Sequence, residues 1–474
     1  MTNPVVFGNS LALEADRHEH TKGMLDTPDA PGPCSASRAL ALCHIAMADV
    51  CSLLGANYKP WLKHNNPDSG IIISKNAAIA AAAYGVISKI YINPVNSNTI
   101  NNYNEYIDTL KHEQGIQEGQ KFGFKIADDV LNQRKDDPLP SDMSKDYYNN
   151  PDKLSYKIHN IDPFHEDRKY YGEKWGDIKT SFGMASVTEV NVKDYTKIIP
   201  YDIEKSIDQV KRFGSYESSE RSEEQKEIGI FWSYDGSHGI GTPPRLYNQF
   251  ILAVAMHDGR DNEIDDLARL FALANIAMAD AGIVAWRAKY EYNIARPARW
   301  LNEGKLDNDG KLIPDRAPFW EPLGAQASYA PIDQPALTNN ASIPSDVFGS
   351  LLASEVGSRR MHFTPPFPAY PSGHATFGTA AFEILKLWRN VPDKNHLNMK
   401  FQSDEFNGKT MDTNEAEKPR AIKERTFQTI DQAIKENNES RIWLGVHWEY
   451  DSIYGSIAGH EIAIKVFNYQ YKTH

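Results

Sequence analysis

Three short segments in the second half of the chain carry the residue types best suited to chemistry. In chain order they are Lys289-Tyr-Glu-Tyr-Asn-Ile-Ala-Arg296-Pro297, Pro371-Ser372-Gly373-His374 and Ser440-Arg441-Ile-Trp-Leu-Gly-Val-His447. Together they supply three side-chain cations, a Ser-Gly pair and two imidazoles. Taken singly, each has a structural explanation, such as solvated charge, a turn before a helix, or a structural histidine. Because all three occur in order, we interpret them as parts of one site.

The three cations predict a site for a small anion. Lys289 and Arg296 are seven residues apart, which is two turns along one face of a helix. If Arg441 joins them, the positive groups repel one another unless an anion neutralises them. A tetrahedral oxyanion such as phosphate or vanadate meets that requirement. The backbone N–H groups of Ser372 and Gly373, at an expected helix start, would add further donors.

The two histidines, His374 and His447, have separate tasks available in such a site. One imidazole can bond to the central atom of the oxyanion, as nucleophile or ligand, and the other can transfer protons near neutral pH. Asp451 follows His447 by one helical turn. It could pair with a cation of the site or orient an imidazole, and the sequence leaves both alternatives open.

Helices must position most of these residues. Small and apolar residues recur at helical spacing in the stretches 36–54, 76–90, 117–134, 244–256, 265–293, 374–389, 419–435 and 440–469. Strand-like segments are scarce and short, the run 228–232 being one candidate. Two polar stretches, 136–227 and 302–370, indicate long irregular connections. The sequence therefore predicts an all-α fold.

A short internal sequence repeat indicates how the helices are grouped. Residues 41–49 (ALCHIAMAD) and 272–280 (ALANIAMAD) agree at seven of nine positions. With the similar helix content of the two halves, this predicts two related helical bundles of the four-helix type, packed together. We expect an N-terminal bundle without catalytic motifs over 1–140 and an irregular connection over 141–227. A C-terminal bundle that carries the site is expected over 228–474.

Composition narrows the partners. Among 474 residues, 63 acidic side chains against 51 Lys and Arg give a net charge of −12, which argues against nucleic acid. The longest apolar run has 11 residues (77–87), short of the ~20 that a membrane span needs. No secretory leader is visible at the N-terminus, so we expect a cytoplasmic protein or one exported by an unconventional route. Three cysteines, Cys34, Cys43 and Cys51, form no disulfide framework.

The three motifs resemble the superfamily that unites type 2 phosphatidic acid phosphatases, bacterial acid phosphatases and vanadium-dependent haloperoxidases. Its pattern is Lys, six residues, Arg-Pro; then Pro-Ser-Gly-His; then Ser-Arg, five residues, His. Longer stretches resemble the vanadium chloroperoxidases in particular, namely FWSYDGSHGIGTPPRLYNQF (231–250), residues 277–300, residues 318–325 and PPFPAYPSGHATFG (365–378). The resemblance covers most of residues 228–470.

The resemblance implies a set of roles. Vanadate would be held by Lys289, Arg296, Ser372, Gly373 and Arg441, with His447 bonded to vanadium and His374 as the acid–base group. Trp286 and Phe367 match positions lining the halide side of the pocket, and Asp235 matches an acidic position that balances the arginines. Phosphate is expected to fit the same site. Residues 298–370 form a longer link than the family usually has, and the surplus around 338–361 predicts a surface insertion at the rim.

The implied activity is that of a haloperoxidase. Hydrogen peroxide would oxidise chloride or bromide to hypohalous acid through a peroxovanadate polarised by Lys289, and a small organic acceptor would then be halogenated. Phe367 stands where related bromide-selective enzymes carry a His, which favours chloride. The alternative is an acid phosphatase, with His447 attacking phosphorus and His374 protonating the leaving alcohol. Vanadate mimics the five-coordinate transition state of that reaction, so one pocket can serve both.

Overall fold

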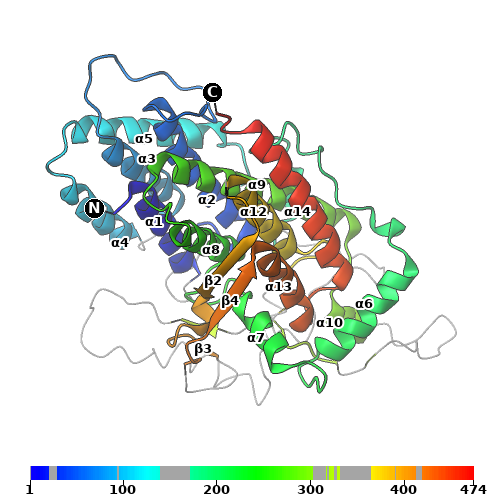
Figure 1. The fold of residues 1–474 in the computed structure, drawn as a ribbon. Helices are drawn as coiled ribbons and strands as arrows, with labels where there is room; N and C mark the ends of the chain where they lie inside the picture. Colours follow the sequence, from blue (N-terminus) through cyan, green and yellow to red (C-terminus); the bar gives the residue numbers. More distant parts are fainter. Residues whose placement is uncertain are drawn as a thin grey trace.

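The computed structural model describes residues 2–20, 29–92, 96–138, 171–302, 317, 320–324, 328–330, 364–389, 391–412 and 419–473. Over this part of the chain the protein is mostly helical, with a few short strands, as the sequence predicted (Figure 1). The predicted insertion at 338–361 lies outside the described residues. The proposed boundaries 1–140, 141–227 and 228–474 stay a prediction.

The first bundle consists of four helices, α1 (Pro4–Glu19), α2 (Gly32–Leu53), α3 (Lys75–Ile90) and α5 (Ile116–Gln133), with α4 (Asn96–Thr109) beside α3. α2 and α3 are rich in alanine, so the helices approach closely and most of their residues are buried. α3 begins where the Ser74 hydroxyl accepts the N–H of Ala77, a standard N-cap.

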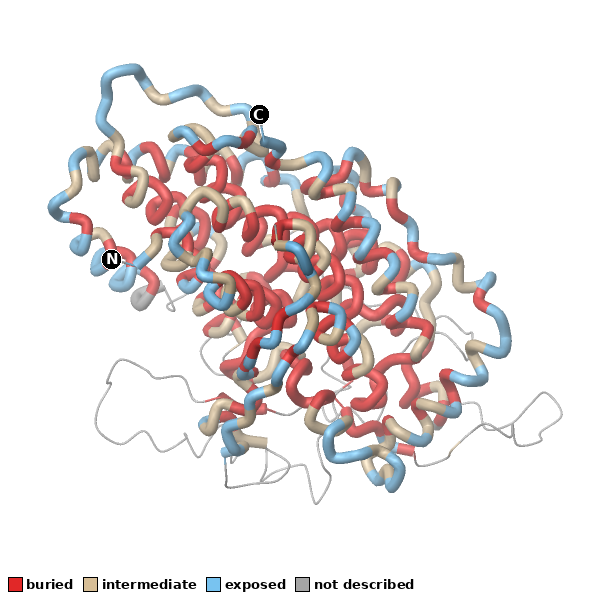
Figure 2. The backbone as a smooth tube through the Cα atoms, in the orientation of Figure 1, coloured by how far each residue is buried: buried red, intermediate tan, exposed pale blue. Residues whose placement is uncertain are grey.

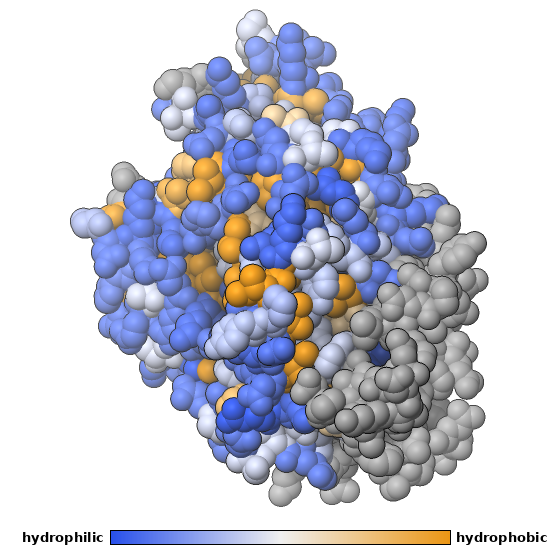
Figure 3. Space-filling view, turned by 90° about the vertical axis from the view of Figure 1, so that its right-hand side faces the viewer, coloured by the Kyte–Doolittle hydropathy of each residue, from blue (hydrophilic) through white to orange (hydrophobic). Residues whose placement is uncertain are grey.

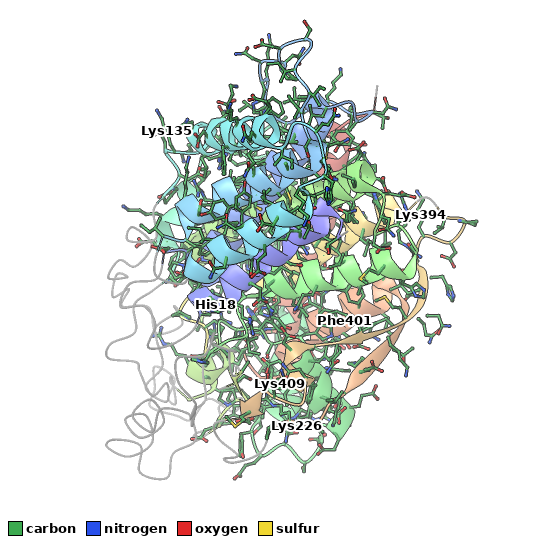
Figure 4. The ribbon with its side chains drawn as sticks, turned by 90° about the vertical axis from the view of Figure 1, so that its left-hand side faces the viewer. His18, Lys135, Lys226, Lys394, Phe401 and Lys409 are labelled. Carbon is green, nitrogen blue, oxygen red and sulfur yellow. The ribbon has the colours of Figure 1, made fainter. Side chains whose placement is uncertain are left out.

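The second bundle consists of α8 (Pro243–His257), α9 (Ile264–Tyr292), α12 (Gly373–Trp388) and α14 (Glu449–Tyr469). Helices α6 (Pro200–Phe213), α7 (Glu223–Phe231), α10 (Pro297–Asn302) and α13 (Ile430–Trp443) border it. The antiparallel strands β2 (His396–Gln402) and β4 (Glu424–Thr429) pair with each other, as do the short strands β1 (Ser328–Tyr329) and β3 (Met411–Asp412). Seen from the side of the first bundle, Phe401 of β2, Lys409 and Lys226 of α7 are labelled below α8, in that order from top to bottom (Figure 4).

The core lies where the bundles meet. α2 packs along α9 at the centre of the molecule, and buried residues are concentrated there and along α12 (Figure 2). α2 and α9 are long and apolar enough to cross a membrane by composition, but 83% and 94% of their apolar windows are buried inside the protein, as in a protein core. The face formed by α14 and α6 is largely hydrophilic, with exposed apolar side chains such as Ile453 and Ile457 among the polar ones (Figure 3).

The sequence repeat of residues 41–49 and 272–280 corresponds to a similar set of buried hydrogen bonds in the two bundles. On α9, the amide of Asn275 bonds both the carbonyl of Phe271 and the side chain of Asn248 on α8. On α2, His44 stands at the matching position and bonds the carbonyl of Leu40 and the side chain of Asn9 on α1. The last residue of each repeat, Asp49 or Asp280, is also buried and accepts backbone N–H groups of an irregular segment. For Asp49 that segment follows in the chain, at Trp61 and Leu62, and for Asp280 it precedes, at residues 182–184.

The helix pairs α3–α5 and α12–α14 also match. A Cβ on Gly123 would meet the carbonyl of Ala78 at 2.1 Å, and a Cβ on Gly459 would meet that of Thr376 at 2.5 Å, so both pairs need glycine for their close approach. The starts of α3 and α12 differ, however. The carboxylate of Glu113 accepts the Ser74 hydroxyl at 2.6 Å and the Asn76 amide at 2.8 Å, so the chain supplies its own anion at the start of α3.

Three secondary-structure predictions were wrong. The run 228–232 belongs to α7 rather than a strand. The stretch 419–435 holds β4 and only then the start of α13, because Thr429 caps that helix through the N–H of Gln432. The stretch 440–469 is broken between α13 and α14, where Gly445 adopts a φ of 71° that ends the helix. The stretch 136–227 also contains α6, whose amphipathic pattern the sequence analysis did not identify.

His44 should make stability depend on pH. Burial lowers the pKa of His44 from 6.5 to about 4. Below pH 6.5 the unfolded chain takes up a proton that the folded chain refuses, so the free energy of unfolding falls as pH drops towards 4. We predict that His44→Asn, which copies Asn275, removes about 2 kcal/mol of the stability lost between pH 7 and pH 4.5. Urea unfolding at pH 7 and pH 4.5 measures it. The exposed His112→Asn is the control, and an unchanged pH dependence in His44→Asn would contradict the prediction.

Candidate active site

The three motifs meet at one end of the second bundle. Lys289 lies in the last turn of α9, Arg296 just beyond it, Ser372 and Gly373 at the start of α12, and Arg441 near the end of α13. All five are buried, as are His374 and His447. Direct contacts join the motifs: the Ser372 N–H donates to the carbonyl of Asp451, four residues past His447, at 3.0 Å. The structure thus brings together every residue that the motifs predicted for the oxyanion.

Lys289 is fixed by backbone carbonyls. Its ammonium donates to the carbonyls of Pro368 and Ala369, both at 3.0 Å, and to that of Pro371. Burial, reinforced by the charges of Arg296 and Arg441, holds the pKa of Lys289 well below its ordinary range. The loop before α12 therefore sets the position of this cation.

Arg296 links the loop before α12 to His447. Its Nε donates to the carbonyl of Phe367 at 3.0 Å and its Nη1 to that of Val446 at 2.8 Å. The same Nη1 lies 3.1 Å from Nε2 of His447. Because the guanidinium is planar and its donors have fixed directions, these bonds set the orientation of the whole Arg296 side-chain group.

Arg441 is held by Asp235. Its two terminal nitrogens donate to the two carboxylate oxygens at 3.0 and 2.7 Å, a bidentate pair. Asp235 follows α7 in the loop before α8, so a fourth segment of the chain enters the site. Nε of Arg441 is buried and faces no acceptor among the described residues. The arginine thus keeps a buried donor for a further oxygen.

Asp451 orients His447, which decides between the two alternatives left by the sequence. Its Oδ2 lies 2.7 Å from Nδ1 of His447 and also accepts the N–H of Trp448 at 3.1 Å. A carboxylate accepts, so we assign the proton of the neutral imidazole to Nδ1. Nε2 then presents its lone pair toward Arg296. Burial and the charges of Arg296, Lys289 and Arg441 lower the pKa of His447 well below its usual value, so Nε2 stays unprotonated.

His374 lies in the first turn of α12, which Ser372 caps through the N–H of Ala375. Its Nε2 is 2.6 Å from the carbonyl of Ser233, so we assign the proton to Nε2 and the lone pair to Nδ1. Burial, and next the charge of Arg441, lower the pKa of His374 to about 3. Ser233 was not predicted, although it lies in the same FWSYDGSHG stretch as Asp235.

Aromatic side chains border the cations on one side. The rings of Trp286 and Phe367 lie 4.8 Å apart, and the Lys289 ammonium is 5.4 Å from the first ring centroid and 5.1 Å from the second. Trp286 also packs beneath Gly373, where an added Cβ would lie 3.3 Å from the indole. The two predicted halide-side residues therefore lie together beside Lys289.

The charges favour an anion. Three basic side chains, Lys289, Arg296 and Arg441, face two carboxylates, Asp235 and Asp451, and burial raises the pKa of Asp451 to about 7. The lowered pKa of Lys289 means that its positive charge is not fully compensated. Among the described residues, no group of three His, Cys, Asp or Glu side chains could hold a metal ion directly. The fold and the site define a helical-bundle protein with a buried cluster of three basic side chains and two histidines, an environment that favours a small anion.

Comparisons with known proteins agree with this class and narrow it. Residues 269–473 match the family model described as the VCPO second helical-bundle domain. The vanadium chloroperoxidase of Curvularia inaequalis is 28% identical, over 95% of this chain and 79% of its own length. A bacterial vanadium-dependent iodoperoxidase has a similar fold, with a TM-score of 0.71 and 18% identity over 99% of this chain and 96% of the other. The apo form of a bacterial vanadium-dependent chloroperoxidase gives 0.60 and 13%, over 94% and 95%. The chain is therefore similar in sequence to a vanadium chloroperoxidase and in fold to vanadium-dependent haloperoxidases, and the motifs indicated the same resemblance.

Arg296→Lys tests the geometry of the centre. The substitution keeps the charge but loses the fork that joins Phe367, Val446 and His447, so affinity for a tetrahedral oxyanion should fall by about tenfold, or ~1.4 kcal/mol. Calorimetric titration with inorganic phosphate measures it. Arg269→Lys on α9, whose guanidinium bonds the carbonyl of Tyr471, is the control. Equal phosphate affinity in Arg296→Lys and the wild type would reject the assignment.

Proposed function

We propose that the protein is a vanadium-dependent haloperoxidase that oxidises chloride or bromide with hydrogen peroxide to hypohalous acid. The observation that carries the proposal is the environment of His447. Its Nδ1 is anchored by Asp451, and its Nε2 lone pair points into a group of three basic side chains. A neutral imidazole nitrogen can ligate vanadium while the cations bind oxygens around it, which suits vanadate.

The residues fit vanadate in detail. Lys289, Arg296 and Arg441 would bind its oxygens together with the hydroxyl of Ser372 and the N–H of Gly373, and His447 Nε2 would bind the metal. The Ser372 N–H, which the sequence predicted as a further donor, instead donates to the carbonyl of Asp451. The buried Nε of Arg441 supplies a donor for one such oxygen. Vanadate bound there would act as a Lewis acid that activates peroxide for attack by halide.

Lys289 and His374 have the remaining chemical tasks. Lys289, fixed by three carbonyls, would polarise the peroxide through its ammonium, whose charge a bound anion would stabilise. His374 is neutral because of its burial, and its Nδ1 lone pair can accept a proton from peroxide and return it to the product. A bound oxyanion would raise the pKa of His374 towards the working pH.

Trp286 and Phe367 favour halide oxidation. Halide would approach beside the two rings, whose edges are electropositive and whose apolar surface removes water from the anion. Phe367 offers no hydrogen-bonding group, and this supports chloride as a substrate alongside the more easily oxidised bromide.

An acid phosphatase is the second candidate, because the His447–Asp451 pair would equally serve an imidazole nucleophile.

We predict that apo protein loaded with orthovanadate brominates or chlorinates a phenolic reporter when peroxide and halide are added. The rate should depend on both halide and vanadate concentration. Hydrolysis of p-nitrophenyl phosphate by the apo protein, without halogenation by the loaded protein, would select the phosphatase.

The two histidines should separate binding from turnover. His447→Ala removes the proposed vanadium ligand, so vanadate affinity should fall by at least about tenfold. His374→Ala leaves the cations and His447 in place, so vanadate binding should stay measurable while turnover falls by about 100-fold. Equilibrium dialysis and halogenation rates measure the two effects. Near-wild-type activity in both variants would reject these roles.

A further inference from the structure

Tyr171 contacts both aromatic residues beside the cations. Its ring is edge-on to Trp286 and tilted against Phe367, with centroids 6.0 Å from each. Its carbonyl accepts the indole N–H of Trp286 at 3.3 Å and the hydroxyl of Tyr290. Its N–H donates to the carbonyl of Pro366, next to Phe367, at 3.0 Å. One residue therefore fixes the two rings relative to each other.

The first bundle holds the other end of Tyr171. The phenol oxygen accepts the backbone N–H of Cys34 at 3.1 Å and that of Ser35 at 3.3 Å, both in the first turn of α2. Pro31 precedes α2 and gives no side-chain cap, so the phenol takes the place of one. Helix α2, which belongs to the bundle without the three motifs, therefore positions the Tyr171 ring at the site.

The fit around Tyr171 is close. Gly32 has a φ of 72°, and a Cβ there would lie 2.7 Å from Cζ of Tyr171. Gly172 has a φ of 81°, and a Cβ there would lie 2.3 Å from Nε1 of Trp286. Both conformations suit glycine alone, and both glycines leave room for the ring and the indole to meet. The ring is consequently wedged between α2 and Trp286 with little freedom to move.

We propose that Tyr171 is a specificity-determining residue of the halide site, forming its third aromatic wall and setting the spacing of Trp286 and Phe367. This inference rests on the proposed haloperoxidase function. Chloride is the smallest and most strongly hydrated of chloride, bromide and iodide, so it depends most on close, rigid walls to replace its water. Iodide is larger and sheds water readily, so it tolerates a wider site. Removing the ring should therefore penalise chloride most.

Tyr171→Leu and Tyr171→Phe test the wall. In Tyr171→Leu, the ratio of kcat/KM for chloride to that for iodide should fall at least tenfold, mainly through a higher KM for chloride. Tyr171→Phe keeps the ring and loses only the bonds to α2, so it should retain the ratio within about twofold. An active Tyr171→Leu enzyme with the wild-type ratio would overturn the inference while leaving the proposed function intact.

Two further measurements separate a local role from general damage. Equilibrium dialysis should give the same vanadate affinity, within twofold, for the wild type and Tyr171→Leu. The Trp286 emission is obtained as the difference in fluorescence between each protein and the same protein with Trp286→Phe. Acrylamide should quench this emission more strongly in Tyr171→Leu than in the wild type. A loss of vanadate binding or unchanged quenching would overturn the local role.

A matched control is Tyr58→Leu. Tyr58 is a buried tyrosine of the first bundle, and its hydroxyl bonds the carbonyl of Asp265 at the start of α9. Asp265 is roughly 36 Å along that helix from Lys289. Tyr58→Leu should lower the melting temperature without changing the halide ratio, and an equal ratio change there would overturn the inference. A wild-type protein that binds vanadate but oxidises no halide would reject the proposed function, and this inference with it.

Discussion

The structure depends on burying three basic side chains next to one another. Lys289, Arg296 and Arg441 are each at most 2% exposed. Burial, and next the positive charge of the neighbouring basic side chains, lowers the pKa of Lys289 and that of His447. Backbone carbonyls and two carboxylates offset part of this cost, and a bound oxyanion would offset the rest. The loop before α12 supplies four of these carbonyls, at residues 367–369 and 371. The break between α13 and α14 supplies the carbonyl of Val446, and the loop after α7 supplies Asp235.

The helix packing and hydrogen bonds around these basic side chains occur in both bundles. Among the described residues, only the second bundle has the three buried basic side chains. Both bundles share a buried side-chain hydrogen bond at the matching position (Asn9 with His44, and Asn248 with Asn275), the serine caps and the close glycine contacts. At the start of α3 the carboxylate of Glu113 bonds Ser74 and Asn76, so that helix start is already neutralised from within. The first bundle thus contributes to the site through packing and through Tyr171, rather than through a second oxyanion centre.

Tyr171 connects the two bundles at the site, and a glycine lies against each of its two contacts, Gly32 on the side of α2 and Gly172 on the side of Trp286. Tyr171 bonds the start of α2 with its phenol oxygen and the indole of Trp286 with its carbonyl. Because its ring is wedged, changes in the first bundle reach the aromatic side of the site without passing through the cations.

The sequence by itself determined the helical class, the repeat and the set of residues at the centre, because helical periodicity and the spacing within each motif are local properties. It failed where local signals conflict: the 419–435 stretch has helix-forming residues, but Thr429 and pairing with β2 make its middle a strand. Only the tertiary structure decided that Asp451 bonds His447 and that Ser233 bonds His374. It alone brought Tyr171 to Trp286. Asp451 lies one helical turn from His447, so the sequence indicated it as a candidate, but only the fold selects among its possible partners. Ser233 and Tyr171 contact residues more than 100 positions away, and no local pattern predicts such contacts.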